Sequence, residues 1–213
     1  MSNTVRLFTQ EKFTMGSKER IQRLKEETRS NIIEAALQIV KEDGWQALSM
    51  RKIADKIEYT APIIYEYFAN KEGILLELTR KGNVLLLNDF KEAIAKCITP
   101  EEQLAAIWMA YWDFAFTHKE FYQLMFGVDM ICCEMVKSQP EAEAARKLTY
   151  DAIAAIMTDP NPSEEIICRK YFTFWSIIHG LISINLVRKG TNDEMNQHIL
   201  KDAINGIIKA INE

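Results

Sequence analysis

The segment "LSMRKIADKIEYTAPIIYEYFANK", Leu48–Lys71, decides the fold because it predicts two short helices joined by a tight turn. Ser49 precedes the first helix and Thr60 precedes the second, and both residue types are favoured N-caps. The connector between the helices is only Glu58 and Tyr59. Two short helices in this arrangement form a helix-turn-helix, whose second helix can enter the major groove of DNA.

The second helix of the pair, predicted from Ala61 to Phe68, has an apolar side and an outward side. Four of its residues fall within one arc of the helix surface: Ala61, Ile64, Tyr65 and Phe68. We expect Ile64 and Phe68 to hold the helix against its neighbours, and Ile63 and Tyr67 to lie on the outward side. That outward side is the candidate reading surface.

Helical periodicity and capping signals extend over the rest of the chain. A long helix begins at Lys18 and ends at Gly44, and Asn70, Thr99 and Asn161 are predicted caps of later helices. No segment has a convincing strand period, so we predict an all-α fold of about nine helices. The predicted parts are a mobile arm (1–17), a helix-turn-helix domain (18–71) and a helical ligand-binding and dimerisation domain (72–213).

Composition restricts the function classes. The 213 residues are 48% hydrophobic, with only 8 Gly and 5 Pro, which suits a helical globular protein. No apolar run approaches the ~20 residues that span a bilayer, and no secretory signal begins the chain, so we expect a cytoplasmic protein without a membrane partner. The four cysteines and three histidines lack metal-site spacing. We therefore expect no metal and no cofactor, and structural thiols at Cys132 and Cys133, although this adjacent pair leaves redox sensing or soft-metal binding open.

Charge is distributed unevenly between the two predicted domains. Residues 1–71 contain twelve Lys and Arg against ten Asp and Glu, whereas residues 72–213 contain fourteen against twenty. A local basic patch on the first part is compatible with phosphate contact despite the net charge of −4. Arg51 and Lys52 add charge near the Ser49 cap, and Lys71 begins the following helix. Periodicity alone leaves two alternatives, a DNA reader and a plain three-helix packing unit.

The run from Ile32 to Leu75 resembles the DNA-binding domain of the tetracycline-repressor-like (TetR) family of bacterial transcription regulators. The resemblance lies in Ala35-Ala36, Gly44, Ser49, Ile53-Ala54, Tyr65-x-x-Phe68-x-x-Lys71, Ile74 and Leu75. It implies contacts to the DNA backbone from Ser49, Thr60, Tyr65, Tyr67 and Lys71, and base contacts from Arg51, Ala61, Pro62 and Ile63. The chain departs from the family at Glu58, where glycine is usual. A left-handed backbone there is costly for a residue with a Cβ.

Large aromatic and methionine side chains are concentrated in the second part of the chain. Such stripes are compatible with plain core and with a cavity for apolar ligands, and "YFTFWSIIHGLISIN" resembles a Trp-x-x-x-His-Gly signature of some TetR carboxy-terminal domains. For Gly180 we expect close helix packing, and for His179 either a structural hydrogen bond or ligand binding. The candidate pocket residues are Trp108, Trp112, Phe116, Tyr122, Met125, Phe126, Tyr171, Trp175 and His179.

Apolar residues on the last two helices, roughly 162–189 and 193–212, exceed what one neighbouring helix covers. The family implies a homodimer through these helices, which matches a palindromic operator. The leading hypothesis is a repressor released from its double-stranded DNA operator by a small apolar or amphipathic effector. The alternative is a helical ligand-binding or partner-binding protein whose helix-turn-helix no longer reads DNA. An enzyme is disfavoured, because the sequence assembles no catalytic set.

Overall fold

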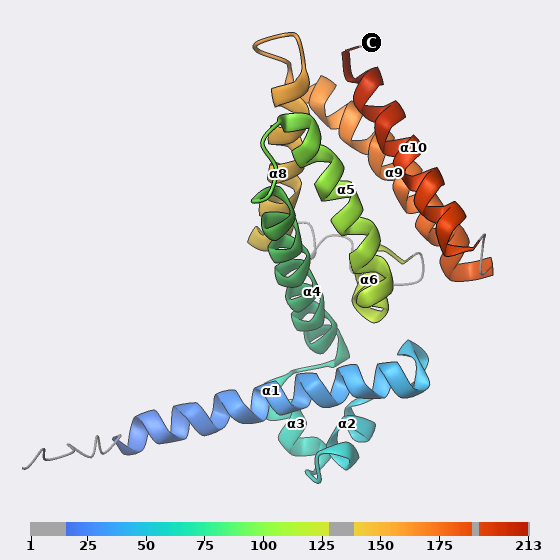
Figure 1. The fold of residues 1–213 in the computed structure, drawn as a ribbon. Coiled ribbons are helices and arrows are strands. Elements are labelled where there is room, and N and C mark those ends of the chain that lie inside the picture. Colours follow the sequence, from blue (N-terminus) through green and yellow to red (C-terminus); the bar gives the residue numbers. More distant parts are fainter. Residues whose placement is uncertain (1–15, 128–138, 189–191, 213) are drawn as a thin grey trace, which may run out of the picture. The chain divides into compact units, whose positions relative to one another are not determined.

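The structure, a computed structural model, describes residues 16–127, 139–188 and 192–212 (Figure 1). These residues form nine α-helices, two 3-10 helices and no strand, so the predicted all-α fold is confirmed. Internal contacts divide the chain into two compact units between Ala69 and Asn70. The sequence places this boundary after Lys71, which in the structure is the first residue of the second unit's first helix.

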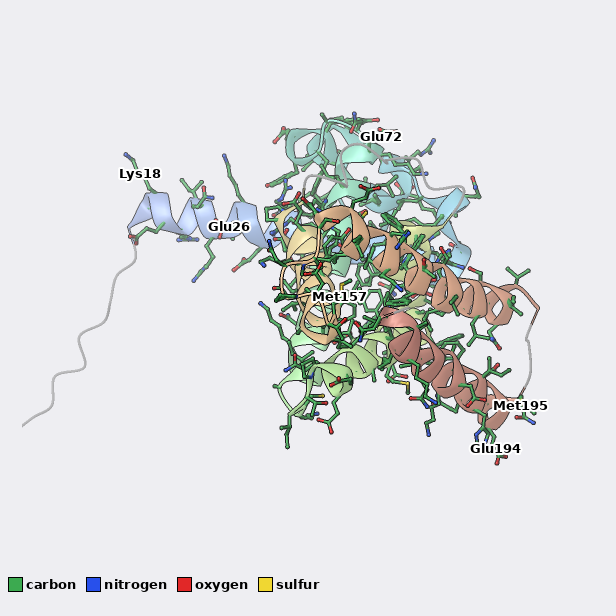
Figure 2. The ribbon with its side chains drawn as sticks, turned by 90° about the horizontal axis from the view of Figure 1, so that it is seen from above. Lys18, Glu26, Glu72, Met157, Glu194 and Met195 are labelled. Atoms are coloured by element: carbon green, nitrogen blue, oxygen red, sulfur yellow. The ribbon has the colours of Figure 1, made fainter. Side chains whose placement is uncertain are left out.

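The N-terminal unit is a three-helix arrangement. Its elements are α1 (Ser17–Asp43), η1 (Trp45–Ala47), α2 (Met50–Lys56) and α3 (Ala61–Tyr67). The buried residues of α1 all lie in its second half, where Ile32, Ala36 and Ile39 are fully inaccessible. The first turns of α1, where Lys18 lies, extend beyond the other helices of the unit (Figure 2). Gly44 ends the helix as predicted, at a φ of 80° that suits glycine.

The turn between α2 and α3 contains a non-glycine residue with left-handed backbone. Glu58 has a φ of 58°, and it is the one such residue among those described outside glycine. The backbone N–H of Tyr59 donates to the carbonyl of Ala54 at 2.9 Å, which closes the turn. The conformation inferred from the family's glycine at this position is therefore present, and Glu58 adopts it against the steric preference of its Cβ.

We expect Glu58→Gly to raise the free energy of unfolding by about 0.5–1 kcal/mol, because glycine adopts positive φ without a Cβ clash but loses more backbone entropy on folding. Urea unfolding of the two proteins measures the difference. Asp55→Gly, inside α2, is the matched control and should destabilise by about 1 kcal/mol. A Glu58→Gly protein less stable than the parent would show that the turn is unstrained.

The C-terminal unit is a bundle of six α-helices among the described residues. They are α4 (Lys71–Ile94), α5 (Pro100–Thr117), α6 (Lys119–Phe126), α8 (Pro140–Ile156), α9 (Glu164–Arg188) and α10 (Asp193–Lys209), and η2 (Ala210–Asn212) follows. Helices α4, α5 and α8 pack on one another, and α9 and α10 run side by side (Figure 1). The core between them contains Trp108, Phe114 and Phe174.

Most of the predicted helix starts are present. The Asn70 side chain accepts from Gly73 N at 3.0 Å, and Thr99 and Glu102 form the predicted reciprocal cap of α5. The prediction for Asn161 is wrong, because α9 begins later and the Ser163 hydroxyl accepts from Ile166 N at 3.4 Å. Asn161 and Ser163 can both form caps and lie on either side of a proline, and Ser163, which is nearer to α9, is the one whose side chain accepts from a helical N–H. In the described ranges no helix has the length and apolar character to cross a membrane.

Candidate functional site

Helix α3 is anchored from behind by two fully buried side chains. Ile64 is inaccessible and Phe68 is 4% exposed, which confirms their predicted core role. Arg29 of α1 adds a contact that sequence reasoning missed. Its guanidinium lies 4.2 Å from the Phe68 ring centroid and donates to the Tyr67 carbonyl at 3.2 Å. Arg29 therefore fixes the carboxyl end of α3 against α1.

The outer face of α3 differs in detail from the predicted one. Tyr65, assigned to the inward arc, is 53% exposed, whereas Ile63 and Tyr67 are half-buried. Tyr67 lies in a shallow hollow lined by α1 residues Lys25 and Arg29. Ile63 and Tyr67 are half-buried because α3 packs against α1 as well as against α2. The buried side of α3 is therefore wider than the positions of Ile64 and Phe68 predict. Tyr65 is the most accessible ring of the candidate DNA surface.

Thr60 occupies the N-cap position of α3 without forming the predicted cap. A cap side chain accepts from the second or third helical N–H, but the second residue, Pro62, has no N–H. The N–H of the third residue, Ile63, donates to the Thr60 carbonyl at 3.0 Å. The exposed Thr60 hydroxyl thus makes no hydrogen bond within the described chain. Ala61 is half-buried and Pro62 is exposed beside it.

The remaining candidate DNA-contact residues differ in whether their side chains already have a partner within the protein. The Ser49 hydroxyl caps α2 by accepting from Lys52 N at 3.2 Å, as predicted. The Lys52 ammonium is paired with Asp43 at 2.6 Å, and this hydrogen bond holds the pKa of the Asp43 carboxyl below its usual value. Arg51 is exposed and forms no ion pair with the described residues. Lys71 is half-buried at the start of α4, in the C-terminal unit.

The C-terminal unit contains a cavity of about 310 Å³ between α4, α5, α6, α8 and α9. Its wall is largely aromatic and aliphatic. Five of the nine candidate pocket residues line it: Trp108, Met125, Phe126, Tyr171 and Trp175. Such a cavity is at the lower end of the ~300–1,000 Å³ range of small-molecule sites, and its lining suits an apolar ligand.

Four candidate residues lie outside the cavity lining. Trp112 and Phe116 line a separate groove with Asn185 and Asn196. At about 100° per residue, Trp112 and Phe116 are rotated from Trp108 in one direction and Tyr111 in the other. The cavity lies on the Tyr111 side, so Trp112 and Phe116 face the separate groove. Tyr122 and His179 do not line the cavity either, but they contact Tyr111, which does.

Sequence reasoning missed two walls of the cavity. One is α4, with Asn83, Leu86 and Phe90, and the other is α8, whose lining residues are Ala142, Glu143, Ala145, Arg146 and Thr149. The signal for the α8 wall is the alanine-rich run "EAEAARK", since small side chains leave space open. Asn83 is buried and donates to Gln139 Oε1 at 2.8 Å. Arg146 gives the lining a cation, and its side chain is 53% exposed.

A hydrogen-bonded cluster of four aromatic residues joins two residues of the cavity wall, Tyr111 and Trp175, to Tyr122 and His179. Trp175 Nε1 donates to the Tyr111 hydroxyl at 3.0 Å, and the Tyr122 hydroxyl is hydrogen-bonded to His179 Nδ1 at 2.6 Å. His179 also stacks on Trp175 at 4.7 Å between centroids. Burial raises the pKa of Tyr122 to about 12 and lowers that of His179. The cluster therefore holds its rings in neutral form and fixes two cavity residues, and His179 has the structural hydrogen bond that was one of its two expected roles.

Among the residues described, no group of three His, Cys, Asp or Glu is placed to hold a metal ion. Cys132 and Cys133, for which redox sensing was left open, lie outside the described residues. Gly180 was expected to mark close helix packing. No described atom outside the α9 backbone lies within 4 Å of the position that a Cβ would take there, so the described part of this unit makes no such contact.

Two family models match the chain, one over the helix-turn-helix and the start of α4 and the other within the C-terminal unit. Residues 32–78 match bacterial regulatory proteins of the tetR family, and residues 104–200 match the tetracyclin repressor-like C-terminal domain. The first match contains the α2–turn–α3 segment, and the second contains most of the helices that enclose the cavity.

Two characterised relatives are similar in sequence. The HTH-type transcriptional activator FasR of Mycolicibacterium smegmatis is 26% identical over 147 residues, which are 68% of this chain and 67% of that protein. The fatty acid metabolism regulator protein of Bacillus subtilis is 33% identical over 76 residues, which are 36% of this chain and 39% of that protein. The second match therefore spans well under half of the relative's length.

The fold is also found in solved structures. The crystal structure of transcriptional regulator FadR from Bacillus subtilis in complex with stearoyl-CoA has a TM-score of 0.61 to this chain at 18% identity. The similarity covers 83% of this chain and 98% of that one. At this identity the comparison establishes a common fold.

Proposed function

Because the chain belongs to the tetR family of bacterial regulatory proteins, we propose that it is a repressor released from a palindromic operator by an amphipathic effector that carries an acyl chain. As a member of the family it is a ligand-responsive, DNA-binding transcriptional regulator. The repressing direction, the effector class, the homodimer and a cytoplasmic location are our proposals.

The outward side of α3 supports DNA reading. Tyr65 and the Thr60 hydroxyl are exposed on a helix that Ile64 and Phe68 hold from behind. A phenol and a hydroxyl at a helix start suit phosphate oxygens, which position a reading helix on the duplex. This exposed side of a rigidly held short helix is the single observation on which the DNA-reading proposal depends.

The chemistry of the cavity supports an effector with an apolar body. Aromatic and methionine side chains make up half of its lining residues, while Asn83, Glu143, Arg146 and Thr149 provide polar groups at a few points. Few polar groups in an apolar wall are the usual composition of a site that orients an amphipathic molecule. An acyl chain fits this wall, and the names of two of these proteins point the same way: the Bacillus subtilis relative is a fatty acid metabolism regulator, and the FadR structure contains stearoyl-CoA.

The exposed face of the last two helices supports a homodimer. On α9 the exposed or open positions Ile177, Gly180, Ile184 and Val187 recur every three or four residues, and on α10 Met195, Ile199 and Gly206 follow at spacings of four and seven. Val187 is 80% exposed, and Met195 stands at the start of α10 (Figure 2). A second copy placed on this face by a two-fold axis would bury it and fill the open space at both glycines.

In the proposed mechanism, DNA and effector bind different states of the dimer. The operator selects the state in which two α3 helices reach half-sites about one helical turn (~34–36 Å) apart. The effector selects the other state, so each ligand lowers the affinity of the other by the same factor.

Operator binding is testable by fluorescence anisotropy with the inverted repeat nearest the protein's own gene. We expect steep salt dependence, with log K falling by about 3.5–5.5 per tenfold increase in salt if roughly four to six phosphates are neutralised. A shuffled duplex of the same length is the control. Absent or salt-insensitive binding would favour the alternative, a helical ligand-binding or partner-binding protein that no longer reads DNA.

The same assay tests the direction of the response. Saturating hexadecanoyl-CoA should weaken operator binding at least about tenfold, the size of a moderate allosteric coupling. Tighter binding would instead indicate an effector that promotes DNA binding. No change, together with no binding of the compound by calorimetry, would reject the acyl effector while leaving the DNA-binding function standing.

A further inference from the structure

We propose that Trp108 is the specificity-determining residue of the effector site, and that its indole N–H donates a hydrogen bond to the carbonyl oxygen of an acyl effector. This assignment rests on the proposed acyl effector and adds to it the atom that is recognised. It predicts that the protein distinguishes an acyl chain from an alkyl chain of the same length.

Trp108 contributes to the cavity wall a buried N–H that has no partner among the described residues. The residue lines the cavity, is 2% exposed, and its Nε1 makes no hydrogen bond with the described residues. A buried N–H without a partner costs about 1–3 kcal/mol. A ligand oxygen that accepts from it removes this cost, so ligands with such an oxygen gain affinity over ligands without one.

The indole of Trp108 is held in a fixed orientation by its neighbours. Its ring meets Tyr111 edge-on at 6.0 Å between centroids and lies 6.2 Å from Tyr171. Tyr111 in turn is fixed by the hydrogen bond from Trp175. A donor that cannot rotate away discriminates sharply between ligands that carry an acceptor and ligands that do not.

Trp175 provides the contrast within the same cavity. It is also a lining tryptophan, but its Nε1 already donates to the Tyr111 hydroxyl at 3.0 Å. Loss of the Trp175 N–H therefore removes a bond inside the protein and no donor that is available to a ligand. The two indoles differ in the feature that the proposal invokes, which makes Trp175→Phe the matched control for Trp108→Phe.

The test uses the full chain and two probes that differ by one oxygen. Hexadecanoyl-CoA carries the thioester carbonyl, whereas S-hexadecyl-CoA, a thioether, has the same chain and the same nucleotide without it. Calorimetry measures both affinities in the parent, in Trp108→Phe and in Trp175→Phe. We expect the parent to prefer the acyl probe about tenfold, the effect of one hydrogen bond to a buried donor.

Trp108→Phe should abolish that preference, so that the two probes bind within about twofold of each other, while Trp175→Phe should retain it. Equal preference in the parent and in Trp108→Phe overturns the assignment of Trp108 and leaves the acyl effector intact. Loss of the preference in both variants also overturns it, because the donor would then not be specific to Trp108. Failure of both probes to bind the parent overturns the acyl effector itself, and the assignment with it.

Discussion

Tyr65→Ala is expected to lower the affinity for the operator about 30-fold without changing the stability of the protein. Tyr65 is 53% exposed and its side chain makes no hydrogen bond in the described residues, so its removal leaves α3 intact. A phenol that donates to a phosphate contributes about 1 kcal/mol, and in a dimer on a palindrome the loss occurs once in each half-site. Anisotropy with the operator duplex and thermal unfolding measure the two quantities.

Two further substitutions make this test specific. Tyr65→Phe should weaken binding almost as much as Tyr65→Ala if the hydroxyl makes the contact. Tyr59→Ala, at a tyrosine that is 43% exposed in the turn before α3 and outside the candidate contact set, should change affinity less than about threefold. Equal losses for Tyr59→Ala and Tyr65→Ala would mean that the candidate reading face is wrongly assigned.

Ile184→Lys is expected to give a monomer that binds the operator more than about 100-fold more weakly than the parent. Ile184 is 56% exposed in the middle of the α9 face formed by Ile177, Gly180 and Val187. An isologous interface buries the new charge twice near the two-fold axis, where its partner is a second lysine. A monomer then holds one half-site only and loses the combined affinity of two linked contacts.

Sedimentation velocity measures the oligomeric state, and anisotropy measures DNA binding on the same samples. Ile98→Lys is the matched control, because Ile98 is 91% exposed in the α4–α5 connection and lies outside the α9–α10 face. It should remain dimeric and bind DNA like the parent. A dimeric Ile184→Lys protein would place the self-association surface elsewhere.

The helices of this chain follow from local chemistry, which is why the sequence predicts most of them. Asn70 and Thr99 satisfy the first N–H groups of their helices within three residues, and Gly44 stops α1 through its own backbone freedom. The cap at Thr60 failed for equally local reasons: Pro62 has no N–H, and the Ile63 N–H donates to the Thr60 carbonyl. Such features depend on residues that are neighbours in sequence, so the sequence predicts them.

The candidate site is less predictable from the sequence, because it depends on the packing of helices that are far apart in the chain. The half-burial of Tyr67 follows from α1 residues more than thirty positions earlier, including Arg29. The cavity exists where alanines of α8 face the aromatic rings of α5 and α9, and a single helical stripe cannot indicate which of its rings meet that space. The stripe therefore identified Trp108 but also Phe116, which lies in a different groove.

The left-handed Glu58 in the turn before α3 has a consequence for how readily this protein can change its operator. New base contacts on a reading helix tend to destabilise the fold, and proteins tolerate such changes only while they remain above a stability threshold. Glycine at position 58 would raise that margin without altering any side chain that faces DNA. Laboratory evolution toward a new target sequence should therefore accept more α3 substitutions when it starts from the glycine background.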